Sequence, residues 1–275
     1  MEVDYFFLIY FAITITGIIT NLYPLLFFTY LARTKTAFGK IASALVFCNL
    51  VIIAITAINV LAKRYLEIRL AKIFDNYSGA VVLWAYFTGH LIRIMISVNR
   101  YIAIFKPFNY DVLFKSKFNC ISLGLMFVGG FLMAVPFALP GLCTFNYDGN
   151  VWIFYSSPFC DTASTMEDYY GGILTCSISL LIDGTVLIGY FIKKYNYRNA
   201  PIDNRPTHIQ IETRLKNSFE LRLFLSCLLS NINMAWLLFM WFYLLALFQN
   251  SIEIAFLFNV IIWMLYHGAD GYVGS

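Results

Sequence analysis

Long apolar runs separated by short polar connections account for most of this chain. Seven of the runs are long enough to cross a lipid bilayer as helices, which takes about 20 residues. They cover residues 5–31, 41–62, 79–104, 119–143, 169–192, 221–248 and 252–272. Because the connections are short, neighbouring helices are expected to run antiparallel in one bundle. The pattern therefore predicts an all-α membrane protein, with a seven-transmembrane helix bundle as the single domain of residues 1–275.

Composition points the same way, since 60% of the residues are hydrophobic and only 12% are charged. Too little polar surface exists to cover a water-soluble domain of this size. The 27 phenylalanines and 19 tyrosines suit lipid-facing surfaces and the aromatic belts at membrane interfaces. A water-soluble fold is therefore excluded.

Lysine and arginine are unevenly distributed among the connections. The connections after the first, third and fifth spans are basic, whereas those on the other side carry few positive side chains. The connection between the second and third spans is an exception on that other side, because it is also basic: it contains Lys63, Arg64, Arg69 and Lys72. Because positive side chains gather in cytoplasmic loops, the sum predicts an N-terminus outside and a C-terminus in the cytosol. The first four residues lack a positive side chain, so the first span is expected to be an uncleaved anchor.

The end of the third span carries an arginine beside an aromatic residue and a short basic loop. Arg100 follows Asn99 and precedes Tyr101, and Lys106 and Pro107 come shortly afterwards. An arginine at bilayer depth costs roughly 2.5–3.5 kcal/mol on insertion scales. At the membrane edge its long side chain reaches the headgroups or a partner from the aqueous side instead. Arg100 is therefore expected at the cytoplasmic surface.

Other polar side chains fall inside the predicted spans: Asn21, Asn49, His90, Arg93, Asp183, His267 and Asp270. Arg93 lies seven positions before Arg100, which puts both on one face of the third helix. Charged groups this deep normally face the bundle interior and pair with one another. The expected ion pairs are Arg93 with Asp183, and Asp270 with Arg93 or Arg100. A functional network and a merely structural one both fit the pattern.

Several short motifs follow one another along these spans. They are Gly17–Asn21, Asn99–Tyr101, Pro107–Tyr110, an outer loop with Pro140–Cys143, Phe145–Asp148, Trp152 and Cys160, then Asp183 and His267–Gly271. In this order the chain resembles a nematode serpentine chemoreceptor, most closely serpentine receptor class X, within the rhodopsin-like superfamily of G-protein-coupled receptors. The resemblance implies a non-enzymatic receptor in the plasma membrane of sensory cilia, which transmits the binding of a small molecule to a heterotrimeric G protein. It implies no cofactor, and the basic loops follow from the topology without a nucleic-acid partner.

The resemblance also implies a switch for G-protein coupling, made of Asn99, Arg100, Tyr101, Lys106 and Pro107. Rhodopsin-like receptors usually have an acid before the arginine, where this chain has Asn99. Glu220, at the base of the sixth span, is expected to hold Arg100 in the resting state instead. Residues 207–219 are spaced for a cytosolic extension of the sixth helix, either a docking surface or a solvated helix. No tail is expected after Ser275.

A ligand pocket is expected between the outer halves of the spans, beneath the loop that joins the fourth span to the fifth. Its candidate residues are aromatic: Trp84, Phe87, Tyr169, Tyr170 and Trp241. Packing or an interfacial belt would also explain each of them. No charged residue lies in the outer half of these predicted spans, so a neutral or lipophilic ligand is expected.

Two cysteines flank the same loop, on the oxidising side of the membrane. A bridge between Cys143 and Cys160 would close a loop of 18 residues, worth roughly 3 kcal/mol in the chain-entropy model. Two free thiols are the alternative. On the same side, Asn76 begins an N-glycosylation sequon close to the third span.

Two other classes of protein stay open. A membrane transporter would usually show internal repeats and paired interruptions by glycine and proline, whereas only Pro136 and Pro140 interrupt the fourth span strongly. An intramembrane aspartyl protease needs two facing aspartates, for which Asp183 and Asp270 are the candidates. However, Gly268-Ala269-Asp270 lacks the Gly-x-Gly-Asp pattern of that family.

Overall fold

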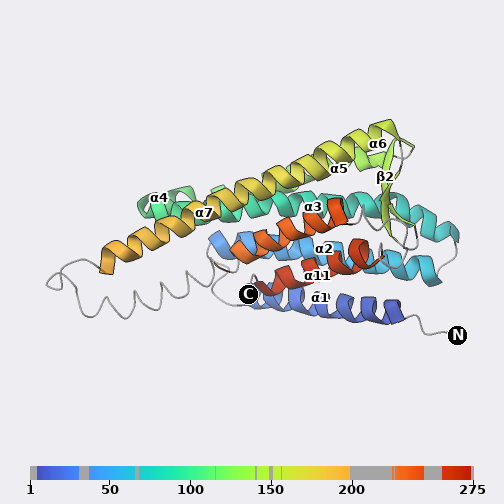
Figure 1. Ribbon diagram of the computed structural model, residues 1–275, viewed down its shortest axis with the longest axis horizontal. Helices are drawn as coiled ribbons and strands as arrows, with labels where there is room; N and C mark the ends of the chain where they lie inside the picture. Colours follow the sequence, from blue (N-terminus) through green and yellow to red (C-terminus); the bar gives the residue numbers. More distant parts are fainter. Residues whose placement is uncertain are drawn as a thin grey trace.

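The computed structural model describes residues 5–30, 37–65, 68–114, 116–139, 141–148, 151–155, 157–198, 225, 227–244 and 256–273. Most of them are helical (Figure 1): α1 Tyr5–Tyr30, α2 Ala37–Tyr65, α3 Ile68–Phe105, α4 Pro107–Leu113, α5 Ser116–Ala134, α6 Pro158–Ala163, α7 Gly171–Arg198 and α11 Ile262–Val273. The helix Cys227–Tyr243, here called the sixth helix, lies between α7 and α11 along the chain. Single turns of other helical types complete these helices: the 3₁₀ turn η2 Val135–Phe137, and the π-helical turns η3 Ser164–Tyr170, η5 Met240–Leu244 and η6 Leu257–Ile261.

Five helical stretches have the length and hydropathy to cross a membrane: Phe7–Leu26, Ala37–Lys63, Tyr77–Phe105, Lys117–Phe137 and Pro158–Ile192. The sixth helix is apolar but shorter. Each of these helices overlaps one predicted span, because a run of about 20 apolar residues forms a helix whose backbone groups are all satisfied internally.

Two predicted span boundaries are wrong. The fourth span does not reach residue 143, because α5 ends at Ala134 and η2 ends at Phe137. Pro136 has no backbone N–H to continue the helix. The fifth helix begins at Pro158, eleven residues before the predicted start. The Ser157 hydroxyl caps it by accepting a hydrogen bond from the Cys160 amide at 3.1 Å, and proline fits the first helical position.

A small antiparallel sheet covers one end of the bundle, so the fold is mostly helical rather than all-α. Its strands are β1 Ala138–Leu139, β2 Cys143–Tyr147 and β3 Trp152–Phe154, in the order β1-β2-β3. We call β2 and β3 the hairpin and the end of the bundle that it covers the hairpin end; α4 marks the opposite end (Figure 1). α1 starts at the hairpin end, and α11 runs from that end toward the α4 end.

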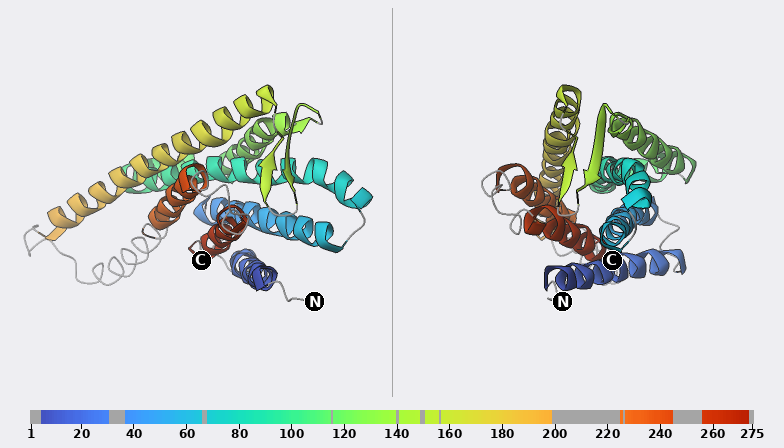
Figure 2. Two further views of the ribbon diagram at one scale, coloured as in Figure 1. Left: turned by 45° about the vertical axis from the view of Figure 1, so that its right-hand side comes forward. Right: turned by 90° about the vertical axis from the view of Figure 1, so that its right-hand side faces the viewer.

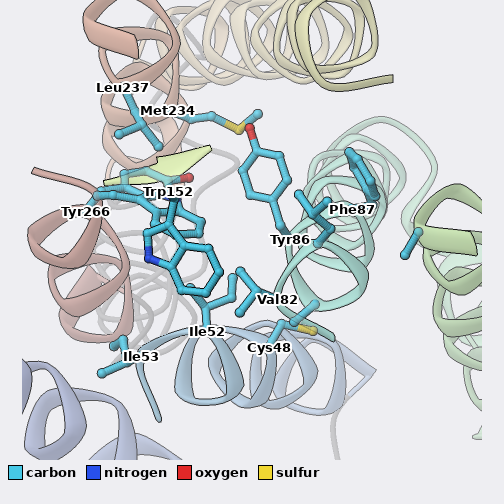
Figure 3. Close-up of a cluster of buried hydrophobic side chains, with 14 of the residues drawn as sticks. Cys48, Ile52, Ile53, Val82, Tyr86, Phe87, Trp152, Met234, Leu237 and Tyr266 are labelled. Carbon is cyan, nitrogen blue, oxygen red and sulfur yellow. The ribbon is translucent and has the colours of Figure 1, made fainter. Parts of the chain in front are cut away.

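The predicted Cys143–Cys160 disulfide is confirmed, and it ties β2 to α6. The hairpin itself packs deeply into the bundle, where Trp152 is 1% exposed and stacks on Phe145 with 5.0 Å between the ring centroids. Figure 3 shows the Trp152 indole among helical side chains, beside Ile52 and Val82. The hairpin therefore adds a layer of buried aromatic side chains to the core at the hairpin end.

The bundle is built around α3, which packs against α2, α5 and α7 (Figure 2), and glycines allow two further close contacts. A Cβ atom at Gly79 of α3 would lie 1.5 Å from the Phe145 carbonyl oxygen, so only glycine lets the hairpin come this near. A Cβ atom at Gly268 of α11 would lie 3.2 Å from the Gly17 Cα atom of α1. Small residues at such crossings are how membrane helices pack closely.

Candidate functional site

A buried ion pair lies at the centre of the bundle. The Arg93 guanidinium of α3 pairs with the Asp270 carboxylate of α11, and both residues are 5% exposed. The Ser230 hydroxyl of the sixth helix accepts from Arg93 and donates to Asp270. The guanidinium carbon also lies 5.4 Å from the centroid of the Tyr266 ring. Charged groups in a membrane interior persist only when they are paired in this way.

Neutral polar groups extend the ion pair to α1 and α2. The Asn49 amide donates to Asp270 at 2.9 Å, and its oxygen is 2.8 Å from His267 Nδ1. The Asn21 amide donates to the His267 carbonyl oxygen at 3.0 Å. We call Asn49, Arg93, Ser230, His267 and Asp270 the polar hub, since they join α2, α3, the sixth helix and α11.

The other predicted pair, Arg93 with Asp183, is wrong. Asp183 of α7 accepts a hydrogen bond from the Asn231 amide at 2.7 Å and lies within electrostatic range of Arg100. His90 contacts α7 as well, with its Nδ1 atom 2.8 Å from the Thr175 hydroxyl. Asp270 therefore pairs with Arg93, whereas Asp183 lies within electrostatic range of Arg100, two turns further along α3.

At the α4 end, Arg100 is 6% exposed and lies over the Phe38 ring of α2, 5.3 Å from its centroid. Asn99 does not pair with it; its amide donates to the Tyr110 hydroxyl at 3.2 Å and so anchors α4 on α3. Tyr101, Lys106 and Pro107 are exposed beside it. Glu220, the predicted partner of Arg100, lies outside the described residues.

A pocket opens at the hairpin end, and its walls come from α3, β2, η3, the sixth helix, η5 and α11. It holds about 350 Å³ of space outside the atoms, including the part open to the surroundings. The lining residues are Leu83, Tyr86, Phe145, Asp168, Leu237, Leu238, Trp241, Phe242 and Trp263. We call it the hairpin pocket. Eight of its nine side chains are apolar or aromatic, and the ninth is a carboxyl group.

One of the five predicted ligand residues, Trp241, lines this pocket. Trp84 donates to the Phe127 carbonyl oxygen of α5 at 3.1 Å, and Phe87 packs on Phe137. The hydroxyl groups of Tyr169 and Tyr243 are 3.0 Å apart, between the fifth and sixth helices. Tyr170 is exposed. Four of the candidates therefore serve helix packing or face outward.

The backbone of Asn76 is helical, because the sequon falls inside α3. Its third residue, Ser78, is buried and donates its hydroxyl to the Asn59 side-chain oxygen at 3.1 Å. Glycosylation of Asn76 stays a prediction.

The hydropathy pattern does not reveal Asp168 as a pocket residue, nor the acidic group that it brings to the pocket. The expectation that the outer half of the spans carries no charge is wrong, because the fifth helix begins earlier than predicted and brings Asp168 inside. The Ser157-Pro158 start signal would have shown this. Trp263 and Tyr86 were not distinguishable from ordinary core residues by their spacing.

Helices of membrane-spanning length around a buried ion pair define a multi-pass membrane protein that is mostly helical, with a polar network inside an apolar core. The chain belongs to the family described as Serpentine type 7TM GPCR chemoreceptor Srx, whose pattern matches residues 11–274. No curated protein matches the chain. The family is one of chemoreceptors rather than enzymes, which confirms the resemblance seen in the sequence and sets the protease alternative aside.

Proposed function

We propose that this chain is a chemosensory receptor of the plasma membrane that crosses the bilayer seven times, with the hairpin end outside and the α4 end in the cytosol. A small molecule binds in the hairpin pocket, and a heterotrimeric G protein binds at the α4 end. The orientation rests on the basic connections at the α4 end and on the disulfide at the hairpin end, since disulfides form in oxidising compartments. Sensory cilia are the expected location.

The observation that carries this proposal is a chain of side-chain contacts that joins the hairpin pocket to the polar hub. Trp263 lines the pocket, and its ring lies 5.6 Å from that of His267, one turn further along α11. His267 contacts Asn49, and Asn49 donates to Asp270. A ligand against Trp263 therefore acts on the same helix that holds one half of the buried ion pair.

Signalling in this scheme is a shift between two packings of the bundle. In the packing described here, Arg100 is buried against Phe38, so its guanidinium is withheld from the cytosolic surface. A ligand that favours a displaced α11 weakens the contacts of Asp270 with α3 and the sixth helix. Movement of these helices then exposes Arg100 and the adjoining Tyr101, Lys106 and Pro107 to a G protein.

Nucleotide exchange on a panel of purified Gα subunits tests the coupling. Membranes containing the receptor are exposed to a mixture of small volatile amines, alcohols and acids. Exchange by wild type and by Arg100→Ala is compared at equal surface amounts, with Lys117→Ala, an exposed residue near the same end, as the control. We expect at least a tenfold loss in Arg100→Ala and no change in Lys117→Ala. Equal exchange in all three proteins, or none with any Gα subunit, would refute the coupling.

Epitope tags test the orientation in intact cells. Tags are placed before Met1, within residues 199–204, and after Ser275. We expect antibody to reach the first tag on unpermeabilised cells and the other two only after permeabilisation. First and last tags on the same side of the membrane would contradict the seven-span layout.

A further inference from the structure

We infer that the hairpin pocket selects a small organic cation, whose ammonium group binds the Asp168 carboxylate. The inference rests on the proposed function in that the pocket is taken as the ligand site, and it names the chemical class of that ligand. Three features of the pocket carry it: a buried acceptor, the lack of a cationic side chain among the described lining residues, and aromatic walls.

Asp168 is a buried acceptor at the edge of this apolar space. It is 7% exposed, lies in the π-helical turn η3, and its carboxyl group lies beside the Tyr86 hydroxyl of α3. A carboxylate has two oxygens and room for about four donors. The single phenol of Tyr86 would use only one of these acceptor positions, and Asp168 lines the pocket, so the carboxylate can also accept from a ligand there.

No cationic side chain neutralises Asp168 among the described residues that line the pocket. Arg93 lies seven residues beyond Tyr86 on α3, about 10 Å along the helix, and is already paired with Asp270. A buried carboxylate without a counter-ion costs several kcal/mol. A ligand that brings its own positive charge pairs with the ionised carboxylate and removes this cost. With a neutral ligand the carboxyl group stays unpaired or takes up a proton, and an anionic ligand adds repulsion.

The walls of the pocket suit a cation with an apolar body. Phe145, Trp241, Phe242 and Trp263 surround the space, and the rings of Trp241 and Trp263 lie 5.9 Å apart. Aromatic faces attract ammonium groups, tryptophan most strongly. The leucine side chains of α3 and the sixth helix cover the remaining wall and suit a short hydrocarbon chain or a single ring.

Two sets of matched compounds test the inference on the full-length receptor in nanodiscs, without G protein. The aromatic set is 2-phenylethylammonium, 2-phenylethanol and phenylacetate; the aliphatic set is 3-methylbutylammonium, 3-methylbutanol and 3-methylbutanoate. Within each set only the charge of the terminal group changes substantially. We expect the cation to bind on the order of 10- to 100-fold more tightly than the alcohol, with no binding of the anion.

Substitutions of Asp168 test whether its carboxylate causes the preference for the cation. Asp168→Asn keeps an oxygen for the Tyr86 hydroxyl, so the fold is retained, and we expect the preference for the cation to fall to about one. Asp168→Glu restores the charge and should restore most of the preference. Asp161→Asn makes the same change at an exposed residue of α6 and should leave binding unchanged.

The inference is overturned if the alcohol or the anion binds as tightly as the cation, if the preference survives in Asp168→Asn, or if no compound of either set binds. These readouts involve no G protein, so they separate an error in the ligand class from an error in the receptor function. Loss of G-protein activation with intact, Asp168-dependent binding would contradict the coupling and leave the ligand class standing.

Discussion

Asp270→Asn tests the ion pair at the centre of the bundle. The substitution preserves the size of the side chain and keeps one oxygen for the Asn49 amide, which donates to Asp270 at 2.9 Å. It removes the only carboxylate that pairs with Arg93 in the described part of the chain. Guanidinium does not lose its proton in proteins, so Arg93 stays charged in a low-dielectric interior.

The magnitude follows from this residual charge. Removing one partner of a buried pair costs about 3–5 kcal/mol, because the other charge is left uncompensated. Arg93→Met should cost less than Asp270→Asn, since Asp270 keeps its donors Asn49 and Ser230 and can take up a proton. The double variant carries no buried charge and should be more stable than Asp270→Asn alone. The coupling free energy between the two sites is expected to be about 3 kcal/mol.

The assay is reversible unfolding of the purified receptor in mixed detergent micelles, with all four proteins of the cycle measured under one condition. Asp161→Asn, which is exposed on α6, controls for loss of a carboxylate as such. If each single substitution lowers the free energy of unfolding by less than about 1 kcal/mol, and the double variant shows only the sum of the two, Arg93 and Asp270 are solvated rather than paired. That result would refute the reasoning about the polar hub.

Three further changes test the packing. Gly268→Val should destabilise the receptor by about 1–3 kcal/mol, because its side chain meets the backbone of α1, whereas Gly124→Val, which has open space around it, should have little effect on thermal unfolding. Cys160→Ser should lower the free energy of unfolding by roughly 3 kcal/mol and abolish the shift in gel mobility on reduction; an unchanged stability would mean that the Cys143 bridge adds nothing. Gly79→Ala should push the hairpin off α3 and reduce ligand binding at least tenfold, and normal binding would contradict the close approach.

Several features of the fold were determined by the sequence alone. The number of apolar residues in a run sets whether a helix can cross a bilayer, and this local property located the five long helices. The pairing of Cys143 with Cys160 also followed from position along the chain, since both flank one loop. Where boundaries were wrong, as at Pro158, the start signal was present in the sequence and had been outweighed by hydropathy.

The partners of the buried charges were decided only by the tertiary structure. Asp183 and Asp270 both lie in the inner half of an apolar run, and the sequence favours neither as the partner of Arg93. Asn49 and Asp270 are 221 residues apart, yet they share a hydrogen bond. The rotation of each helix about its axis selects the pair, and that rotation depends on close crossings such as Gly17 against Gly268.

The pocket shows the same division. Its aromatic character follows from composition, and Trp241 was found from the sequence. The sequence does not reveal the charge of the pocket or its connection to the polar hub through Trp263. Both depend on which face of three helices turns toward the hairpin. Hydropathy and charge vary along one dimension and determine which residues enter the membrane. The packing of side chains between helices that are distant along the chain determines which of those residues meet.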